Sequence, residues 1–235
     1  MTATPSQRAE RPPFSETLAG AAEALGLQLS TEQTGKLLDY VVLLGRWNRT
    51  YNLTAVRDPA EMLTQHVIDS LAALPALRRT LPGPKRVLDV GSGGGLPGVV
   101  WAIVEPTLDV TCVDSVGKKA AFIQQAALVL RLGNLRAEHA RVERLQAPPF
   151  DVLTSRAFAS LPDFVALTQT LAKPGGVWLA MKGKLPLDEI AALPSGFQAF
   201  HVEHLNVPGL AAERCLIWIR KTAPMMANRE SGRLQ

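Results

Sequence analysis

The first third of the chain places apolar residues at the three- and four-residue spacing of amphipathic helices. Ser30 followed by Gln33 has the form of a capping box, which predicts that a helix begins there. Asp58 is suited to be an N-cap, and Pro59 after it is suited to a first helical turn. These two residues predict another helix from Pro59 to Leu74. The pattern therefore predicts an N-terminal helical segment over residues 14–81.

From residue 85 onward the period changes, and short β-branched runs alternate with helical stretches. This alternation is typical of βαβ units in a parallel sheet, so we expect an α/β domain over residues 85–221. Only the turn from Asn206 to Gly209 separates the last two runs, which predicts an antiparallel pair. The expected strands cover residues 86–90, 109–114, 134–138, 151–155, 176–181, 199–205 and 214–220, and helices are expected to begin near residues 96, 118, 142, 161 and 186.

The two ends of the chain show neither period. Residues 1–13 mix Arg, Glu, Pro, Ser and Thr, and residues 222–235 hold few apolar side chains. Chain ends of this kind are seldom ordered. We therefore expect a disordered tail over residues 1–13 and a flexible tail over residues 222–235.

Composition and charge narrow the class of protein. Of the 235 residues, 47% are hydrophobic and 20% are charged, as in ordinary globular proteins. We see no export signal and no run of about 18 apolar residues, so we expect a cytoplasmic protein without membrane contact. Cys112 and Cys215 lie inside apolar runs without metal-ligand spacing, which predicts buried thiols and no metal site. The net charge of +4 permits an anionic partner without requiring one.

A glycine-rich turn follows the first expected strand, where an open α/β sheet binds its ligand. It reads Gly91-Ser92-Gly93-Gly94-Gly95-Leu96-Pro97-Gly98, and a tight turn alone does not need this many glycines. The dinucleotide pattern Gly-x-Gly-x-x-Gly fails when it is counted from Gly91, because the sixth residue is Leu96. It fits from Gly93, two residues late, so a nicotinamide dinucleotide site is the weaker alternative.

Two aspartates near this turn indicate the ligand. Asp89 lies in the strand itself, and a carboxylate there pairs with an ammonium group but repels phosphates. Asp114 ends the second strand, where a carboxylate either accepts hydrogen bonds from ribose hydroxyls or caps the next helix. A nucleoside that carries an amino acid satisfies both aspartates. This predicts S-adenosylmethionine as the cofactor.

With these motifs in view, the sequence resembles the RsmG (GidB) family, the bacterial 16S ribosomal RNA guanine-N7 methyltransferases, from about Leu37 to Arg220. The glycine turn alone indicates only a superfamily, whereas the Asn-Leu-Thr and Ser-Arg-Ala-Phe motifs are specific in this order and spacing. The segments that carry the resemblance are Trp47 to Thr54, His66 to Leu71, Leu88 to Gly98, Val113 to Lys119, Arg141 to Glu143 and Ser155 to Phe158.

The resemblance implies a class I, Rossmann-like methyltransferase: a seven-stranded, mostly parallel sheet with an antiparallel last strand, preceded by the N-terminal helices. It implies methyl transfer from S-adenosylmethionine to N7 of a guanosine, guanine-527 in the 530 loop of 16S rRNA. The partner would be 16S rRNA or the small ribosomal subunit, and we expect a monomer. A methyltransferase for another RNA, a protein or a small molecule is the first alternative, followed by an oxidoreductase and by a non-catalytic RNA-binding protein.

The resemblance also implies roles for single residues. Gly91 and Leu96 would line the cofactor, and Asp114 would bind the ribose. Val142 and Glu143 would lie beside the adenine, and Arg156 would close the site. Together with the aspartate and the glycines of the turn, the expected cofactor-binding residues are Asp89, Gly91, Gly93, Gly95, Leu96, Asp114, Ser115, Val142, Glu143 and Arg156.

The motif Ser155-Arg156-Ala157-Phe158 bears on the methyl acceptor. Both cysteines lie in the middle of expected strands, which argues against a cytosine-C5 enzyme with a cysteine nucleophile. Arg156 offers only donors, which suit the acceptor edge of guanine and suit a clamp on the cofactor carboxylate equally well; of the two roles we favour the clamp. Phe158 either stacks on a flipped guanine or packs in the core. No residue is assigned as the catalytic group, because N7 already has a free lone pair.

Cations outside the pocket would hold the RNA, because phosphate contacts position such a substrate. We favour Lys182, which ends a strand on the ligand side, and add Arg49 and Asn52 around the Asn-Leu-Thr motif. Each of these residues is also compatible with an ordinary solvated surface position. His66 and Asp69 lie three apart on an expected helix, and we favour packing against the sheet over an acid-base role.

Overall fold

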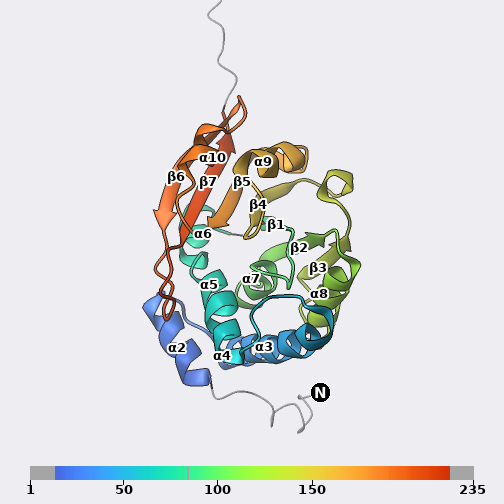
Figure 1. Cartoon of the computed structure of the whole chain (residues 1–235), viewed down its shortest axis with the longest axis vertical. Helices are drawn as coiled ribbons and strands as arrows, with labels where there is room; N and C mark the ends of the chain where they lie inside the picture. The colour runs from blue at the N-terminus through green and yellow to red at the C-terminus, as the bar shows by residue number, and fades with distance from the viewer. Residues whose placement is uncertain (1–13, 84, 223–235) are drawn as a thin grey trace, which may run out of the picture.

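Seven strands form one sheet in the computed structural model, which describes residues 14–83 and 85–222 (Figure 1). The strand order is β3-β2-β1-β4-β5-β7-β6, and the strands from β3 to β5 in this order run parallel. All seven expected strands are therefore confirmed. They are β1 (Lys85–Val90), β2 (Leu108–Asp114), β3 (Leu135–His139), β4 (Phe150–Ser155), β5 (Ala172–Lys182), β6 (Phe197–His204) and β7 (Cys215–Lys221).

The central strands are apolar in nearly every position because both faces of the sheet are covered. In β5, Val177 and Met181 belong to the hydrophobic cluster on one face, whereas Trp178 and Ala180 belong to the cluster on the other. Successive side chains of a strand point to opposite faces, so a strand between two helical layers has no polar face. This burial explains why the strands could be found from their apolar runs.

The last two strands form the expected antiparallel hairpin. β7 lies between β5 and β6 and runs antiparallel to both, with Leu179 opposite Trp218 on one side and Val202 opposite Ile217 on the other. The connecting loop returns Arg214 to the beginning of β7, at the edge where β5 ends, because Lys182 is paired with Cys215. The antiparallel arrangement therefore brings a residue from late in the chain to the carboxyl ends of the parallel strands.

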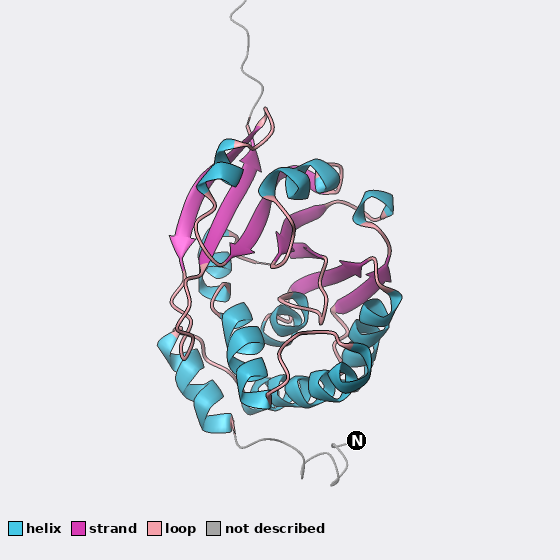
Figure 2. Ribbon diagram, viewed as in Figure 1, coloured by secondary structure: helices cyan, strands magenta, loops and turns pink. Residues whose placement is uncertain are grey.

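Helices cover both faces of the sheet (Figure 2). α7 (Gly98–Val104) and α8 (Gly117–Val129) pack on one face, and α9 (Leu161–Thr168) and α10 (Leu187–Ala191) on the other. The helix expected near residue 142 is wrong in kind, because η2 (Val142–Arg144) is only a short 3₁₀ turn. Pro148 and Pro149 follow it, and proline neither continues a helix nor allows a helical residue easily before it.

The N-terminal helices pack outside α7 and α8. They are α2 (Ser15–Ala24), α3 (Thr31–Tyr51), α4 (Pro59–Met62), the π-helix η1 (Leu63–Ile68), α5 (Asp69–Leu71) and α6 (Leu74–Thr80). The expected capping box is confirmed: Ser30 Oγ accepts from the N–H of Gln33 at 3.1 Å, and Gln33 Oε1 accepts from the N–H of Ser30 at 2.9 Å.

The helix expected from Pro59 to Leu74 begins as predicted but is not regular. Asp58 Oδ1 accepts from the N–H of Ala60 at 2.9 Å, so the cap is confirmed. The following turns form the π-helix η1, and Ser70 Oγ of the next helix, α5, donates to the carbonyl of His66 in η1 at 2.6 Å. Hydroxyl groups that bond to helix carbonyls compete with the regular backbone pattern, and π-turns occur often at functional sites.

The helical segment and the sheet share one hydrophobic cluster. Tyr40 Oη, on α3, donates to the carbonyl of Gly94 at 2.5 Å, and Trp101 Nε1, on α7, donates to the carbonyl of Ser70 at 2.9 Å. The division into residues 14–81 and 85–221 stays a prediction. The expected tails lie outside the described residues, apart from Thr222, whose N–H donates to the carbonyl of Gly196 at 2.8 Å.

The described residues include no helix that is long and apolar enough to cross a membrane.

The bond from Tyr40 gives a first prediction. Tyr40→Phe removes the hydroxyl from a fully buried site and leaves the carbonyl of Gly94 without this donor. We expect the free energy of unfolding in urea to fall by about 1 to 2 kcal/mol. Tyr51→Phe is the matched control because Tyr51 is exposed, and an equal loss in both variants would contradict the assignment.

Candidate active site

The glycine-rich turn is anchored between β1 and β2. The N–H groups of Gly91 and Ser92 donate to the carbonyl of Val113 at 2.9 and 3.3 Å, and Ser92 Oγ donates to the carbonyl of Asp89 at 2.7 Å. Gly91 and Gly93 have φ angles of 66° and 58°, a region that side chains other than glycine rarely adopt. The turn therefore holds a fixed shape that depends on these glycines.

The glycines divide into two groups by what surrounds them. A Cβ at Gly91 or Gly93 would meet no atom within 4 Å, so a ligand can lie against this main chain. A Cβ at Gly95 would lie 2.4 Å from a Val99 methyl, and one at Gly98 would lie 2.5 Å from Cys112 Sγ. Gly98 therefore lets the beginning of α7 pack closely on the sheet, and Gly95 leaves room for the Val99 side chain, whereas Gly91 and Gly93 leave open space.

Asp89 is a fully buried carboxylate beside this turn. Its Oδ2 accepts from the N–H of Gly98 at 2.9 Å, while its Oδ1 has no hydrogen-bond partner among the described residues. Burial raises the pKa of Asp89 to about 7, because the loss of hydration outweighs the opposing effects of the hydrogen bond from Gly98 and the charge of Arg156. A positively charged group at Oδ1 would supply what the protein lacks here. The residues present thus fit the ammonium group of S-adenosylmethionine.

Asp114 links the turn to the beginning of α8. Its Oδ2 accepts from the N–H of Gly93 at 2.9 Å, and its Oδ1 accepts from the N–H of Val116 at 2.9 Å. Capping of the next helix and binding of ribose hydroxyls therefore do not exclude each other. The carboxylate holds the beginning of α8, and each of its oxygens keeps a further lone pair for a ribose hydroxyl. Lys119 Nζ lies 3.8 Å away and adds a favourable charge.

The other expected cofactor residues lie around these two aspartates. Leu96 is buried and follows the glycines in the turn. Ser115 is exposed directly after β2. In η2, Val142 packs in a cluster with Val90 and Val113, and Glu143 is exposed. Their contribution to cofactor binding stays a prediction.

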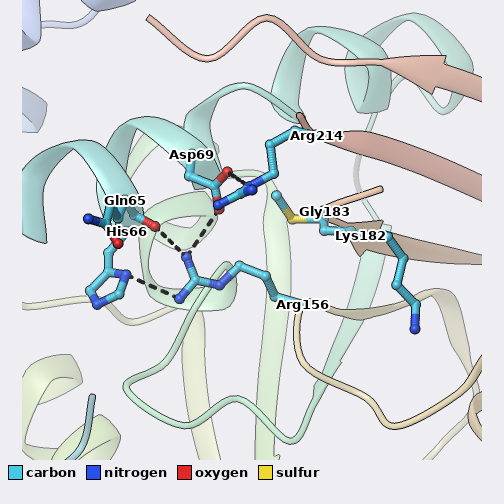
Figure 3. A pocket seen from close by; sticks show the side chains of 8 residues that line it. Gln65, His66, Asp69, Arg156, Lys182, Gly183 and Arg214 are labelled. Carbon is cyan, nitrogen blue, oxygen red and sulfur yellow. Dashed lines mark hydrogen bonds and ion pairs between the residues drawn. The ribbon is translucent and has the colours of Figure 1, made fainter. Parts of the chain in front are cut away.

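A polar cavity of about 300 Å³ lies at the carboxyl ends of β4 and β5 (Figure 3). It adjoins the glycine turn, because Ser155 Oγ, next to Arg156, donates to the carbonyl of Val90 at 2.8 Å. Its lining comes from η1 and α5, from the ends of β4 and β5, and from the loop before β7. The lining residues are Gln65, His66, Asp69, Arg156, Met181, Lys182, Gly183 and Arg214.

Arg156 is held at this cavity by residues of η1 and α5. Its Nη1 donates to the carbonyl of Gln65 at 2.8 Å and to Asp69 Oδ2 at 3.2 Å. Its Nη2 lies 3.3 Å from His66 Nδ1 (Figure 3). The guanidinium expected to close the site is therefore positioned by the N-terminal helical segment.

His66 is buried in its neutral form. A guanidinium has no acceptor, so Nδ1 of His66 accepts from Arg156 and Nε2 carries the proton. Nε2 then donates to Thr54 Oγ1 at 2.8 Å, which ties the Asn-Leu-Thr motif to Arg156. Burial, followed by the charge of Arg156, lowers the pKa of His66 to about 4. At neutral pH this imidazole is a fixed acceptor.

The structure separates the candidates for RNA contact. Arg49 and Asn52 are exposed at the end of α3, and Asn52 Oδ1 accepts from Arg57 Nη2 at 3.2 Å. Lys182 contributes to the cavity wall, but its Nζ bonds to Glu189 Oε2 at 2.9 Å and points away from the Arg156 cluster (Figure 3). Phe158 packs against Phe164, with 5.4 Å between ring centroids. Their roles toward RNA stay predictions.

Sequence reasoning missed Gln65 and Arg214 and assigned His66 and Asp69 to packing. His66 and Asp69 are buried, as packing requires, but their polar atoms face Arg156 at the cavity. Asp69 and Arg214 are 145 positions apart, so no local pattern joins them. The available signal was the His66 to Leu71 segment, which belongs to the family resemblance without an assigned role.

Residues 14–83 and 85–222 bring together no group of three His, Cys, Asp or Glu side chains that could hold a metal ion. Cys112 and Cys215 are buried free thiols, as expected.

The fold defines the class of protein, that of the Rossmann-like methyltransferases. A methyltransferase from Thiobacillus denitrificans, solved with S-adenosyl-L-homocysteine, has a TM-score of 0.53 at 15% identity over 75% of this chain and 96% of its own. TrmN from Thermus thermophilus has a TM-score of 0.54 at 25% identity, over 65% of this chain and 49% of its own. The expected Rossmann-like methyltransferase fold is confirmed.

The family is equally clear. The family model described as rRNA small subunit methyltransferase G (GidB) matches residues 33–217. Ribosomal RNA small subunit methyltransferase G of Paracidovorax citrulli (strain AAC00-1) is 61% identical over 219 residues, which cover 88% of this chain and 90% of that protein. The chain belongs to the rRNA small subunit methyltransferase G family, and the resemblance found in its motifs is confirmed.

Proposed function

We propose that the protein transfers a methyl group from S-adenosylmethionine to N7 of a guanosine in the 530 loop of 16S rRNA. The observation that carries the cofactor is the buried carboxylate of Asp89, which has one oxygen without a partner beside an open glycine turn. Membership of the family supports the rRNA acceptor.

In this proposal the cofactor extends along the carboxyl ends of β1 and β2. Asp89 binds its ammonium group, the main chain at Gly91 and Gly93 lies against it, and Asp114 binds the ribose. Leu96, Ser115, Val142 and Glu143 complete the pocket around the nucleoside. When bound, the cofactor supplies an electrophilic methyl group on a sulfonium.

The same geometry argues against the oxidoreductase alternative. The dinucleotide pattern fits only when it is counted from Gly93, so a pyrophosphate would have to lie against the main chain of Gly95 and Gly98. Both of these glycines face packed side chains instead. A buried Asp89 would also repel a pyrophosphate.

The chain's own residues need only position the acceptor. N7 of guanine has a free lone pair, so no group of the protein has to remove a proton. The cofactor held by Asp89 would supply its methyl carbon to this lone pair, and its sulfur would keep the electron pair of the bond that is given up. One positive charge therefore passes from the sulfonium to the purine. The base has to enter from the side of β4, where the arginine-lined cavity lies.

The partner in this proposal is 16S rRNA, free or within the small ribosomal subunit. The net charge of +4 is compatible with such a substrate. The expected monomer and cytoplasmic location stay predictions.

The pKa of Asp89 makes cofactor binding depend on pH. Above pH 7 the carboxylate is ionised and attracts the ammonium group, whereas below pH 7 it is protonated and the attraction is lost. We expect the affinity for S-adenosylmethionine, measured by calorimetry, to fall about fivefold from pH 7.5 to pH 6, a range in which an α-amino group stays mostly protonated. Asp89→Asn should bind weakly at both values, because the amide keeps the shape but not the charge.

Asp188→Asn, an exposed carboxamide control on α10, should retain the pH dependence of the unmodified protein. The cofactor assignment to Asp89 is wrong if Asp89→Asn shows the same fall in affinity. In the same instrument, heat from NADH without heat from S-adenosylmethionine would contradict the proposed class.

Mass mapping of 16S rRNA tests the acceptor. In a strain that lacks the gene we expect the 530 loop to lose 7-methylguanosine, and a plasmid copy of the gene should restore it. An unchanged modification in the deletion strain would contradict the proposed function, even if S-adenosylmethionine binds.

A further inference from the structure

The carboxylate of Asp69 binds two arginines at once. Its Oδ1 accepts from Arg214 Nε at 2.7 Å, and its Oδ2 lies 3.2 Å from Arg156 Nη1 (Figure 3). The Asp69 side chain is 1% exposed, whereas Arg156 and Arg214 are 23% and 25% exposed. A carboxylate buried behind two arginines that are about one-quarter exposed holds both in place and leaves their outer edges at the cavity.

The hydrogen bonds of the arginines leave donors available. Arg156 uses N–H groups of Nη1 and Nη2 for Gln65, His66 and Asp69, which leaves its Nε–H and one Nη2–H without a partner among the described residues. Arg214 donates from Nε to Asp69 and from Nη1 to the carbonyl of Glu213. Its Nη2 has no hydrogen-bond partner among the described residues. Unsatisfied donors of two fixed guanidiniums favour a ligand rich in acceptors.

The charges around the cavity favour an oxyanion. Two guanidiniums face one carboxylate, and His66 is neutral because its Nδ1 accepts from Arg156. The Lys182 ammonium is turned away and paired with Glu189. The two guanidiniums thus share the one carboxylate among the residues that line the cavity, and guanidiniums bind oxyanions with strong, charge-assisted hydrogen bonds.

The direction of charge transfer argues against the purine as the ligand of the arginines. Methylation at N7 makes the base positively charged, and guanidiniums next to the base would oppose this change. The same guanidiniums stabilise a phosphate throughout the reaction. A phosphate of the nucleotide whose base enters the site is therefore the better partner.

The position in the sheet argues against the carboxylate of the cofactor. A cofactor that extends from Asp89 on β1 to Asp114 on β2 has its amino-acid end at β1, which lies two strands from β5 and three strands from β7 in the sheet order. Arg214 precedes β7 and lies at the end of β5. An oxyanion between Arg156 and Arg214 is thus displaced toward the acceptor side of the sheet.

We propose that Asp69 is a positioning residue that holds Arg156 and Arg214 together as a clamp for one backbone phosphate of the RNA, at the nucleotide that is methylated. This inference rests on the proposed function. Asp69 touches neither cofactor nor RNA in this arrangement and acts only through the two arginines.

The test uses the full-length protein with Arg214→Gln and Asp69→Asn. The control is Arg79→Gln on α6, where an exposed arginine pairs with Glu203 at 2.7 Å away from the cavity. RNA affinity is measured on a 16S rRNA transcript over a series of salt concentrations, and cofactor affinity by calorimetry. Arg214→Gln keeps the pair between Asp69 and Arg156, so it tests the clamp even if Asp69→Asn folds poorly.

We expect Arg214→Gln and Asp69→Asn to weaken RNA binding about tenfold or more. The slope of log affinity against log salt should become shallower by about 0.7, the value of one lost phosphate contact on single-stranded nucleic acid. S-adenosylmethionine affinity should stay within about twofold of the unmodified protein, and Arg79→Gln should change none of these quantities at the cavity. Arg214→Lys should recover part of the salt slope, because it keeps the charge.

Three results would overturn the inference. Unchanged RNA affinity in Arg214→Gln would show that the clamp does not bind RNA. Weaker RNA binding with an unchanged salt slope would assign Asp69 and Arg214 a merely structural role. Weaker S-adenosylmethionine binding with unchanged RNA binding would assign the oxyanion to the cofactor carboxylate. Failure of the unmodified protein to methylate the transcript or small subunits would instead count against the proposed function.

Discussion

A buried carboxylate must be compensated, and the protein meets this constraint differently at Asp89 and Asp69. Asp69 has two guanidiniums, so its charge is offset within the chain. Asp89 has one backbone N–H, a weak contact to Cys112 Sγ and an oxygen without a partner in the described part of the chain. Removing one member of a buried ion pair typically costs several kcal/mol, which makes the first arrangement structural. The second arrangement is completed by a cationic ligand.

This difference divides the edge of the sheet into two parts. At β1 and β2 the open glycines and the incompletely compensated Asp89 favour a ligand with a positive charge. At β4, β5 and β7 the cavity carries an excess of guanidinium groups, which favours a ligand with a negative charge. A sulfonium cofactor and a polyanionic acceptor therefore meet opposite electrostatic environments on neighbouring strands.

The N-terminal helices contribute contacts to the site itself. Tyr40 on α3 bonds to the glycine turn, and η1 and α5 present Gln65, His66 and Asp69 to Arg156. His66 in turn connects Arg156 with Thr54. Both halves of the site are thus held by side chains or carbonyls that precede the sheet in the sequence.

Much of this fold could be predicted from the sequence, because its signals are local. Strands that are buried on both faces consist of apolar runs. Ser30 and Gln33 indicate the beginning of a helix, and the glycines indicate the turn after β1. The regular helix expected across Leu63–Ile68 was wrong, since the π-turn depends on how this segment packs. The pairing of Asp69 with Arg156 and Arg214 depends on tertiary structure and has no local pattern. The direction of the Lys182 side chain is likewise set by Glu189, on another element.

The most direct measurement is a crystal structure of the protein with S-adenosyl-L-homocysteine and a short RNA that contains the target guanosine. The account predicts the amino group of the cofactor product at Asp89 Oδ1, N7 of the guanine facing its sulfur, and a phosphate between Arg156 and Arg214. A cofactor carboxylate between these two arginines, or a guanine outside the cavity at the ends of β4 and β5, would contradict it.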